Sequence, residues 1–193
     1  MKTSNAGIHL IMKYEGCRLK AYKALPTERY YTIGYGHYGA DVSANMVISQ
    51  TEAIKILQKD LNKFEKLVNN KNLNLTQNMF DALVSFTYNC GGANLDRLVY
   101  NRSLKQIADA MLKYNKAGGK TYVGLTKRRN EERALFLKDY KEIPTDKDYE
   151  RIAREVIDGQ WGNGKVRKDR LTEAGYDYKT VQTLVNRIIT NGK

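Results

Sequence analysis

Apolar side chains recur at helical spacing near the start of the chain and lead to an acidic residue. Ile8, Ile11 and Met12 follow the i, i+3, i+4 pattern, and the next position of that stripe is Glu15. A carboxyl group on such a face is partly desolvated, and desolvation raises a carboxyl pKa, as a general acid near neutral pH requires. The alternative is a solvent-facing residue in the last helical turn, beside the helix-ending Gly16.

A strand pattern follows this acid. Residues 30–37, YYTIGYGH, are rich in aromatic and β-branched side chains and are interrupted by glycines, which predicts a strand with a close backbone approach. We expect a small sheet at about residues 18–41. An acid that leads into a short sheet would stand at the wall of a cleft.

Helical patterns resume after the sheet. Ser49 and Glu52 have the spacing of a capping box before a long helix, and Thr76 is a cap for a helix that is apolar on most sides. Shorter helices are predicted at about 95–100 and 103–114, and another at 124–137. Together with the sheet, they predict an α+β fold for residues 1–140.

The C-terminal region has a separate helical pattern. Residues 141–147, KEIPTDK, have the composition of a linker. After it, residues 148–193 contain one apolar stripe around residues 152–157 and two further helical segments, 167–174 and 180–189. We expect a small three-helix bundle.

Charge and cysteine content limit the functional classes to which this protein can belong. The 193 residues carry a net charge of +12, from 33 basic and 21 acidic residues, and 24 of the basic and 14 of the acidic ones precede residue 148. The excess predicts a polyanionic partner, either nucleic acid or the anionic wall of a bacterium, unless it only keeps the protein in solution. Cys17 and Cys90 are too few for a disulfide framework, so we expect free, buried thiols, and with two histidines we expect no metal site.

Several motifs resemble the phage-type lysozymes of glycoside hydrolase family 24. They are Glu15-Gly16, Ala21-Tyr22, the string Thr32 to His37, the string Phe80 to Phe86, and Gly124-Leu125 with Arg128-Arg129 and Glu132. The resemblance covers about residues 5–139. It implies a lysozyme-like two-lobed domain, with a small sheet lobe plus a helical lobe, that cuts the β-1,4 bond between N-acetylmuramic acid and N-acetylglucosamine.

The resemblance also implies catalytic roles. Glu15 would be the general acid of an inverting reaction, and Thr32 would lie beside the attacking water. The family usually has an aspartate where this chain has Ala24. Glu28 is the nearest carboxylate, and it is either the base that replaces this aspartate or a solvated turn residue. The basic run near Arg129 and Arg133 either faces the wall polymer or forms a solvated helix face.

The C-terminal bundle resembles a small cell-wall-binding repeat of phage lysins. The matching residues include Val156-Ile157, Trp161 to Gly164, Arg170-Leu171 and Ala174 to Tyr176. Trp161 is either an aromatic platform for a wall fragment or a core residue, and Asp158 and Arg187 are candidate polar contacts. One copy of the repeat is present.

We therefore expect a monomeric endolysin whose partner is bacterial peptidoglycan, with no cofactor, no metal, no nucleic acid and no membrane span. No apolar run approaches the ~18 residues of a spanning helix, and the polar N-terminus lacks a signal peptide pattern. We expect it in the host bacterial cytoplasm before release. The alternatives are a chitin-directed glycosidase and a non-catalytic protein that binds wall or nucleic acid.

Overall fold

The chain folds into two compact units, residues 1–140 (unit 1) and 141–193 (unit 2). The computed structural model describes residues 1–140 and 146–191. Most of the expected linker, residues 141–147, therefore lies outside the described residues. Each unit has its own hydrophobic core.

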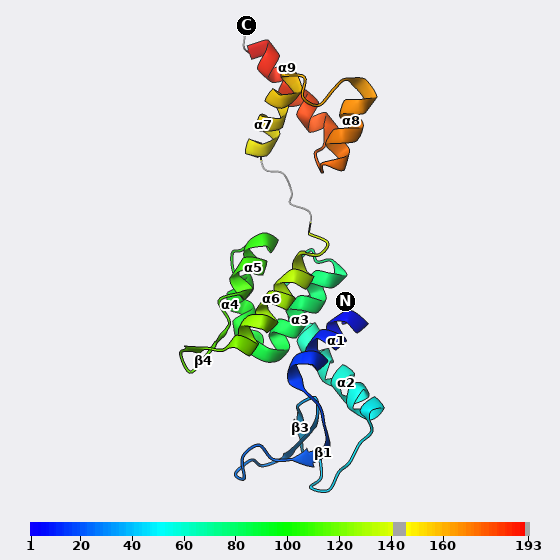
Figure 1. Cartoon of the computed structure of the whole chain (residues 1–193), viewed down its shortest axis with the longest axis vertical. Helices are drawn as coiled ribbons and strands as arrows, with labels where there is room; N and C mark the ends of the chain where they lie inside the picture. Colours follow the sequence, from blue (N-terminus) through cyan, green and yellow to red (C-terminus); the bar gives the residue numbers. More distant parts are fainter. Residues whose placement is uncertain (141–145, 192–193) are drawn as a thin grey trace. The chain divides into compact units, whose positions relative to one another are not determined.

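Unit 1 combines a small sheet with a larger group of helices (Figure 1). Its elements in chain order are α1 (Asn5–Glu15), β1 (Arg18–Tyr22), β2 (Tyr31–Gly34), β3 (His37–Gly39), α2 (Gln50–Asn69), α3 (Gln77–Cys90), α4 (Gly92–Val99), α5 (Leu104–Met111), β4 (Lys116–Ala117), β5 (Lys120–Thr121) and α6 (Val123–Leu137). The long helix α2 leads from the sheet to the helices. The expected α+β fold with two lobes is confirmed.

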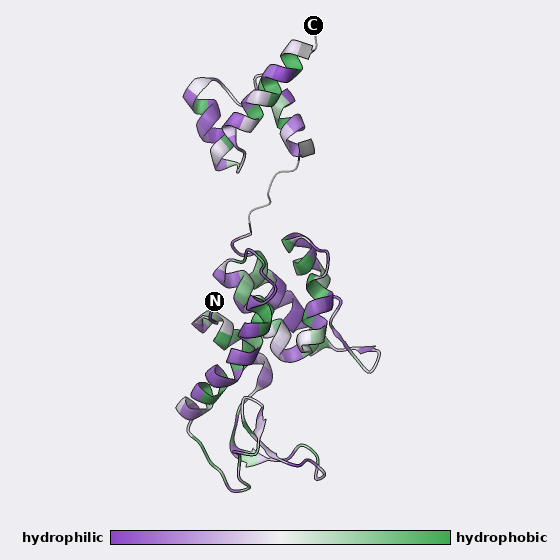
Figure 2. Ribbon diagram, turned by 180° about the vertical axis from the view of Figure 1, so that it is seen from behind, coloured by the Kyte–Doolittle hydropathy of each residue, from purple (hydrophilic) through white to green (hydrophobic). Residues whose placement is uncertain are grey.

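Local sequence signals explain where the helices begin. The predicted capping box of Ser49 and Glu52 opens α2, and Thr76 caps α3. Along α2, apolar and charged residues alternate at helical spacing (Figure 2), and the apolar stripe is buried in the core. In α3, residues 79–87 are all buried, so this helix is the centre of the helical lobe.

The first sheet is antiparallel, in the order β1-β2-β3. Thr32 pairs with Tyr22 on β1 and with Tyr38 on β3. Its neighbour Ile33 is fully buried in the core of unit 1. Because successive strand residues point to opposite faces, Thr32 lies on the face that turns away from this core.

Helix α1 is fixed against α3 by a buried carboxylate. Asp81, which is 0% exposed, accepts a hydrogen bond from the backbone N–H of Ser4, the N-cap residue of α1, at 2.9 Å. Gly7 permits the close approach, because a Cβ atom there would lie 2.9 Å from Asp81 Cβ. A second buried carboxylate, Glu65 of α2, accepts hydrogen bonds from Thr3 N and Thr3 Oγ1, both at 2.9 Å. The start of α1 is thus held by two other helices.

Unit 2 contains α7 (Asp146–Ile157), α8 (Gly164–Glu173) and α9 (Tyr178–Asn191). Its core consists of Ile152, Ala153, Val156, Leu171, Val181 and Val185. These residues come from all three helices, so the predicted stripes meet in one small core.

The two cysteines are free, as expected, but Cys17 is exposed and Cys90 is only partly buried. The expectation of buried thiols was therefore wrong for Cys17. Gly16, with φ of 65°, turns the chain out of α1, and Cys17 follows it at the surface. Within the described ranges, every helix is too short or too polar to cross a membrane.

The Glu65 contacts predict a pH-dependent stability. Burial acts to raise the pKa of Glu65, but hydrogen bonds from Lys2 and Thr3 outweigh it and hold the pKa below its usual range. The stabilisation is therefore present above the unfolded-state pKa of about 4.3 and is lost as the pH falls through the lower folded-state value. We expect Glu65→Gln to lower the free energy of unfolding at pH 7 by about 2 kcal/mol.

Urea unfolding of the wild type and of Glu65→Gln at pH 7, 5 and 3 measures the difference in their free energies of unfolding. This difference should become small at the lowest pH. A difference that is the same at all three pH values would show that the charge of Glu65 contributes nothing to stability.

Candidate active site

Glu15 is the last residue of α1, where the helix gives way to the sheet. Its side chain is 23% exposed, so it is neither fully in the core nor free in solvent. It lines a cavity of about 430 Å³ together with residues of α3, α6 and the β4–β5 hairpin. The acid thus stands at a cavity, at the end of the helix that leads into the sheet.

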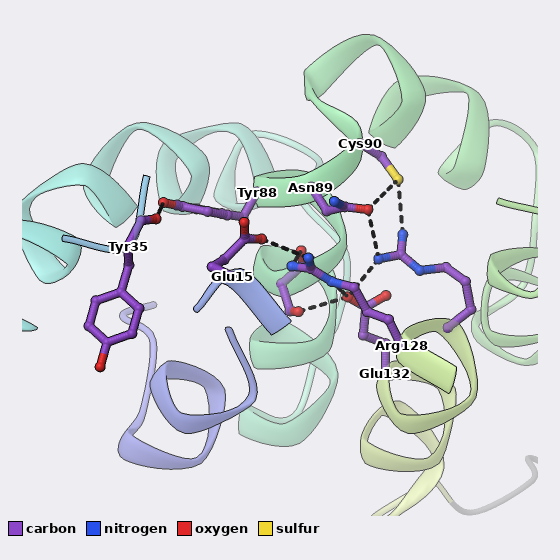
Figure 3. A network of polar contacts seen from close by, with 9 residues as sticks. Glu15, Tyr35, Tyr88, Asn89, Cys90, Arg128 and Glu132 are labelled. Carbon is purple, nitrogen blue, oxygen red and sulfur yellow. Dashed lines mark hydrogen bonds and ion pairs between the residues drawn. The ribbon is translucent and has the colours of Figure 1, made fainter. Parts of the chain in front are cut away.

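Arg128 of α6 holds this carboxylate. Its Nη1 atom donates to Glu15 Oε1 at 2.6 Å (Figure 3). The arginine is 3% exposed, and its other nitrogens are also bound: Nε donates to Glu132 Oε1 at 3.0 Å and Nη2 to the Ser85 carbonyl at 3.2 Å. Because three different acceptors fix the guanidinium, the position of the Glu15 carboxylate is fixed as well.

Glu132 is the buried centre of this network. It is 0% exposed and also accepts from Ser85 Oγ at 2.7 Å and from Arg129 Nη2 at 2.9 Å. Burial raises the pKa of Glu132, while Arg129 and Arg128 act in the opposite direction. The carboxylate therefore depends on its two arginine partners for compensation of its buried charge.

This network corrects the expectation for the basic run of α6. Arg128 and Arg129 are 3% and 0% exposed, so they neither face a wall polymer nor form a solvated helix face. The spacing explains the difference, because Glu132 lies four and three residues after them on the same helix and draws both guanidiniums inward. Lys127 and Arg133 of the same helix stay nearer the surface, and Arg133 pairs there with Asp109.

Arg129 also fixes residues at the end of α3. It donates from Nη1 to Cys90 Sγ at 2.9 Å and from Nη2 to Asn89 Oδ1 at 3.2 Å (Figure 3). Asn89 lines the same cavity as Glu15. The network therefore orients a second polar side chain at the cavity.

A tyrosine links α3 to the sheet lobe. Tyr88 donates from its hydroxyl to the Tyr35 carbonyl at 2.7 Å, in the turn that joins β2 and β3 (Figure 3). Burial, with the nearby charges of Glu15 and Asp60, raises the pKa of Tyr88. The phenol thus stays protonated and remains a donor, which ties the two lobes together beside Glu15.

The cavity has a polar and an apolar part. Tyr14, Glu15, Asn89 and Arg128 supply the polar groups, and Ala117, Tyr122, Val123, Gly124 and Leu125 supply the rest. Burial, reinforced by the nearby charge of Glu131, raises the pKa of Tyr14 to about 12, so this phenol is neutral. In the parts of the chain that the structure describes, no group of three or more His, Cys, Asp or Glu residues could hold a metal ion.

Thr32 and Glu28 are not among the residues that line this cavity. Thr32 is 9% exposed, and its hydroxyl has no hydrogen bond to any residue in the described ranges. Glu28 lies in the loop between β1 and β2, where its Oε2 atom accepts from the Ala24 amide at 2.8 Å. The Glu28 carboxylate is thus engaged in holding its own loop.

The predicted wall-binding residues of unit 2 occupy different places. Trp161 donates from its indole N–H to Glu155 Oε2 at 2.9 Å and packs edge-on against Tyr176. It lines a shallow cavity with Glu155 and residues of α8. Arg187 lines another cavity, of about 510 Å³, with Tyr149 and Lys179. Asp158 is exposed and lines neither.

The contacts of Glu15 could not be predicted from the sequence. Arg128 and Glu132 were recognised only as part of a resemblance, and Asn89 and Tyr122 were not singled out. The i, i+4 spacing of Arg128 and Glu132 was the available signal. Nothing in the local sequence shows that Arg128 binds Glu15, which lies 113 residues earlier in the chain.

Comparisons with known proteins match both units. The Phage lysozyme family matches residues 12–132, and the CW_7 repeat matches residues 150–189. The endolysin of Bacillus phage B103 is 50% identical over 146 residues, which cover 71% of this chain and 54% of that protein. The endolysin of Salmonella phage P22 is 35% identical over 150 residues, which cover 71% of this chain and 99% of that protein.

Two solved structures agree with this assignment. The muramidase domain of SpmX from Asticaccaulis excentricus has a TM-score of 0.62 and 36% identity, over 70% of this chain and 97% of that one. A mutant of P22 lysozyme has a TM-score of 0.61 and 34% identity, over 71% of this chain and 99% of that one. The chain spans about half the length of the first curated relatives, 54% and 55%. With the motifs around Glu15, these matches confirm the resemblance: the chain belongs to the phage lysozyme family, whose domain it carries at residues 12–132.

Proposed function

We propose that this protein is an endolysin that hydrolyses the β-1,4 bond between N-acetylmuramic acid and N-acetylglucosamine in peptidoglycan. The observation that carries the proposal is the placement of Glu15, a partly exposed acid at a cavity, whose carboxylate is fixed by the buried Arg128. The relatives named endolysin and the neighbour named a muramidase domain support the substrate.

In this proposal Glu15 is the general acid. Its Oε1 atom accepts from Arg128, whereas Oε2 has no hydrogen bond to another residue in the described ranges. Oε2 is therefore the atom that would carry the proton to the leaving glycosidic oxygen. The fixed carboxylate contributes orientation, since a proton donor must lie within hydrogen-bond reach of the oxygen that it protonates.

Thr32 is the proposed second group, which would orient the attacking water. It lies on the face of the sheet that turns away from the core, and its hydroxyl is unpaired within the described residues. A water on the opposite side of the sugar from the acid gives inversion at the anomeric carbon. Glu28 is the competing candidate for activating this water, although the Ala24 amide already occupies one of its oxygens.

Unit 2 is the proposed wall-binding module. Its match to the CW_7 repeat and its own core support an independent module. Arg187 would contact the wall from the 510 Å³ cavity, and Trp161 would present the part of its ring that Tyr176 leaves open, near Asp158. Tethering to the wall raises the effective concentration of the active site at its substrate.

We also propose that the protein accumulates in the host bacterial cytoplasm before release. Both cysteines are free, and Cys17 is exposed, which suits a reducing compartment. Cell fractionation during expression, with the protein followed by immunoblot, tests this location.

Glu15→Gln should abolish activity and preserve the fold. The amide keeps the shape of the side chain and can still accept from Arg128, but it cannot deliver a proton, so we expect the rate to fall by about 10²- to 10⁴-fold. Clearing of purified peptidoglycan, followed by turbidity, measures this rate.

Glu131→Gln is the matched control, because Glu131 pairs with Lys13 and does not line the cavity. It should cut at nearly the wild-type rate. If Glu15→Gln melts like the wild type and still cuts at a comparable rate, Glu15 is not the acid.

Thr32→Ala and Glu28→Gln separate the two candidates for water activation. If Thr32 orients the water, Thr32→Ala should lower the rate strongly and Glu28→Gln should have little effect. If Glu28 is the base, Glu28→Gln should cost nearly as much as loss of Glu15, and the limb of the pH–rate profile that it controls should disappear. The pH–rate profiles of both variants, with melting temperatures as the folding control, decide between them.

Removal of unit 2 should separate cutting from wall binding. A protein that ends at Tyr140 keeps the whole core of unit 1, so it should fold and cut soluble peptidoglycan fragments at the normal rate. Its binding to intact walls, measured by co-sedimentation, should be weaker. Equal sedimentation of both proteins would contradict the binding role of unit 2.

A further inference from the structure

The amide of Asn89 has a defined orientation at the Glu15 cavity. Its Oδ1 atom faces Arg129 Nη2 at 3.2 Å, and a guanidinium can only donate, so the oxygen must be on this side. The Nδ2 atom consequently points away from Arg129, toward the side where Glu15 lies (Figure 3). Arg129 is itself held by Glu132, so the amide is fixed before any ligand arrives.

This nitrogen is a free donor. Asn89 is exposed, and its Nδ2 atom has no acceptor among the residues that the structure describes. An oriented, unpaired donor at a cavity beside a catalytic acid is suited to an acceptor on the substrate.

The opposite part of the cavity is apolar and exposed. Tyr122 is 50% exposed and Val123 is 73% exposed, and both line the cavity with Ala117 of the β4–β5 hairpin. None of these side chains is needed for the core of unit 1. A group that binds between Asn89 and this wall would therefore have both an acceptor and an apolar part.

The charges at the cavity favour a neutral acceptor. All three guanidinium nitrogens of Arg128 are already bound, to Glu15, to Glu132 and to the Ser85 carbonyl, so this arginine is not directed at a ligand. An acetamido group is neutral, and it carries one carbonyl oxygen and one methyl group. Its carbonyl oxygen suits the donor of Asn89, and its methyl group suits the apolar side chains of Tyr122 and Val123.

We propose that Asn89 recognises the 2-acetamido group of the hexosamine that lies on the helical-lobe side of Glu15. Nδ2 donates to the acetamido carbonyl, and the methyl group packs against Tyr122 and Val123. This inference rests on the proposed hydrolysis of peptidoglycan and assigns a specificity-determining residue to that site.

The test compares three forms of one substrate: purified peptidoglycan, the same material after chemical de-N-acetylation, and that product after re-N-acetylation. Rates of the full chain are measured on each form for the wild type, Asn89→Ala and Asn94→Ala. Asn94 is the matched control, because its Nδ2 atom donates to the Cys90 carbonyl and it does not line the cavity.

The readout is the rate on acetylated wall divided by the rate on de-N-acetylated wall. The free amines of the second substrate are repelled by this basic protein, but this effect is common to all three proteins and cancels when the ratios are compared. Asn89→Ala should lower the ratio by roughly 3- to 10-fold, as expected for loss of one hydrogen bond. Asn94→Ala should keep the wild-type ratio. For each protein, re-N-acetylation of the wall should restore the rate that the protein has on the untreated wall.

A merely structural role of Asn89 predicts a different result. If Asn89 only supports Arg129, its removal lowers the rates on both substrates by the same factor, the ratio stays at the wild-type value, and the inference is overturned. Failure of the proposed function is distinct, since the wild type would then cut none of the three substrates.

Discussion

The buried pairing of Glu132 with Arg128 and Arg129 is the interaction on which the active-site arrangement depends. One carboxylate oxygen accepts from both guanidiniums within 3.0 Å, in a part of the lobe where all three residues are nearly inaccessible. Such a cluster adds little net stability, because desolvation of the charges offsets their attraction. Its effect here is geometric, since Arg128 reaches from the cluster to Glu15 and Arg129 reaches to Asn89.

Helix α1 carries the acid, and other helices constrain it at both ends. At its start, Asp81 of α3 binds the Ser4 cap, and Gly7 allows the two helices to approach closely. At its end, Arg128 of α6 binds the side chain of Glu15. A rigid helix of 11 residues fixed at two ends places its last side chain with little freedom. The position of Glu15 is therefore a property of the whole helical lobe.

The features that the sequence predicted well are those with local causes. Helical period and the caps at Ser49 and Thr76 located α2 and α3, and the aromatic and β-branched string around Thr32 located the sheet. The features that it did not predict are long-range. The basic run of α6 has the composition of a surface, and only a tertiary partner shows that Arg128 is buried. Cys17 was expected inside because cysteine is usually buried, whereas the turn at Gly16 exposes it.

Charge and recognition act at different distances in this protein. The net charge of +12 is spread over many exposed lysines and arginines, so it would attract an anionic polymer from solution, and salt would weaken this attraction. At the cavity, Arg128 is bound to Glu15 and to the buried Glu132. The other groups that line the cavity, such as Asn89, Tyr122 and Val123, are neutral and can discriminate only by hydrogen bonding and shape. In the proposed function, long-range attraction brings the protein to the polymer, and neutral contacts beside Glu15 select the sugar.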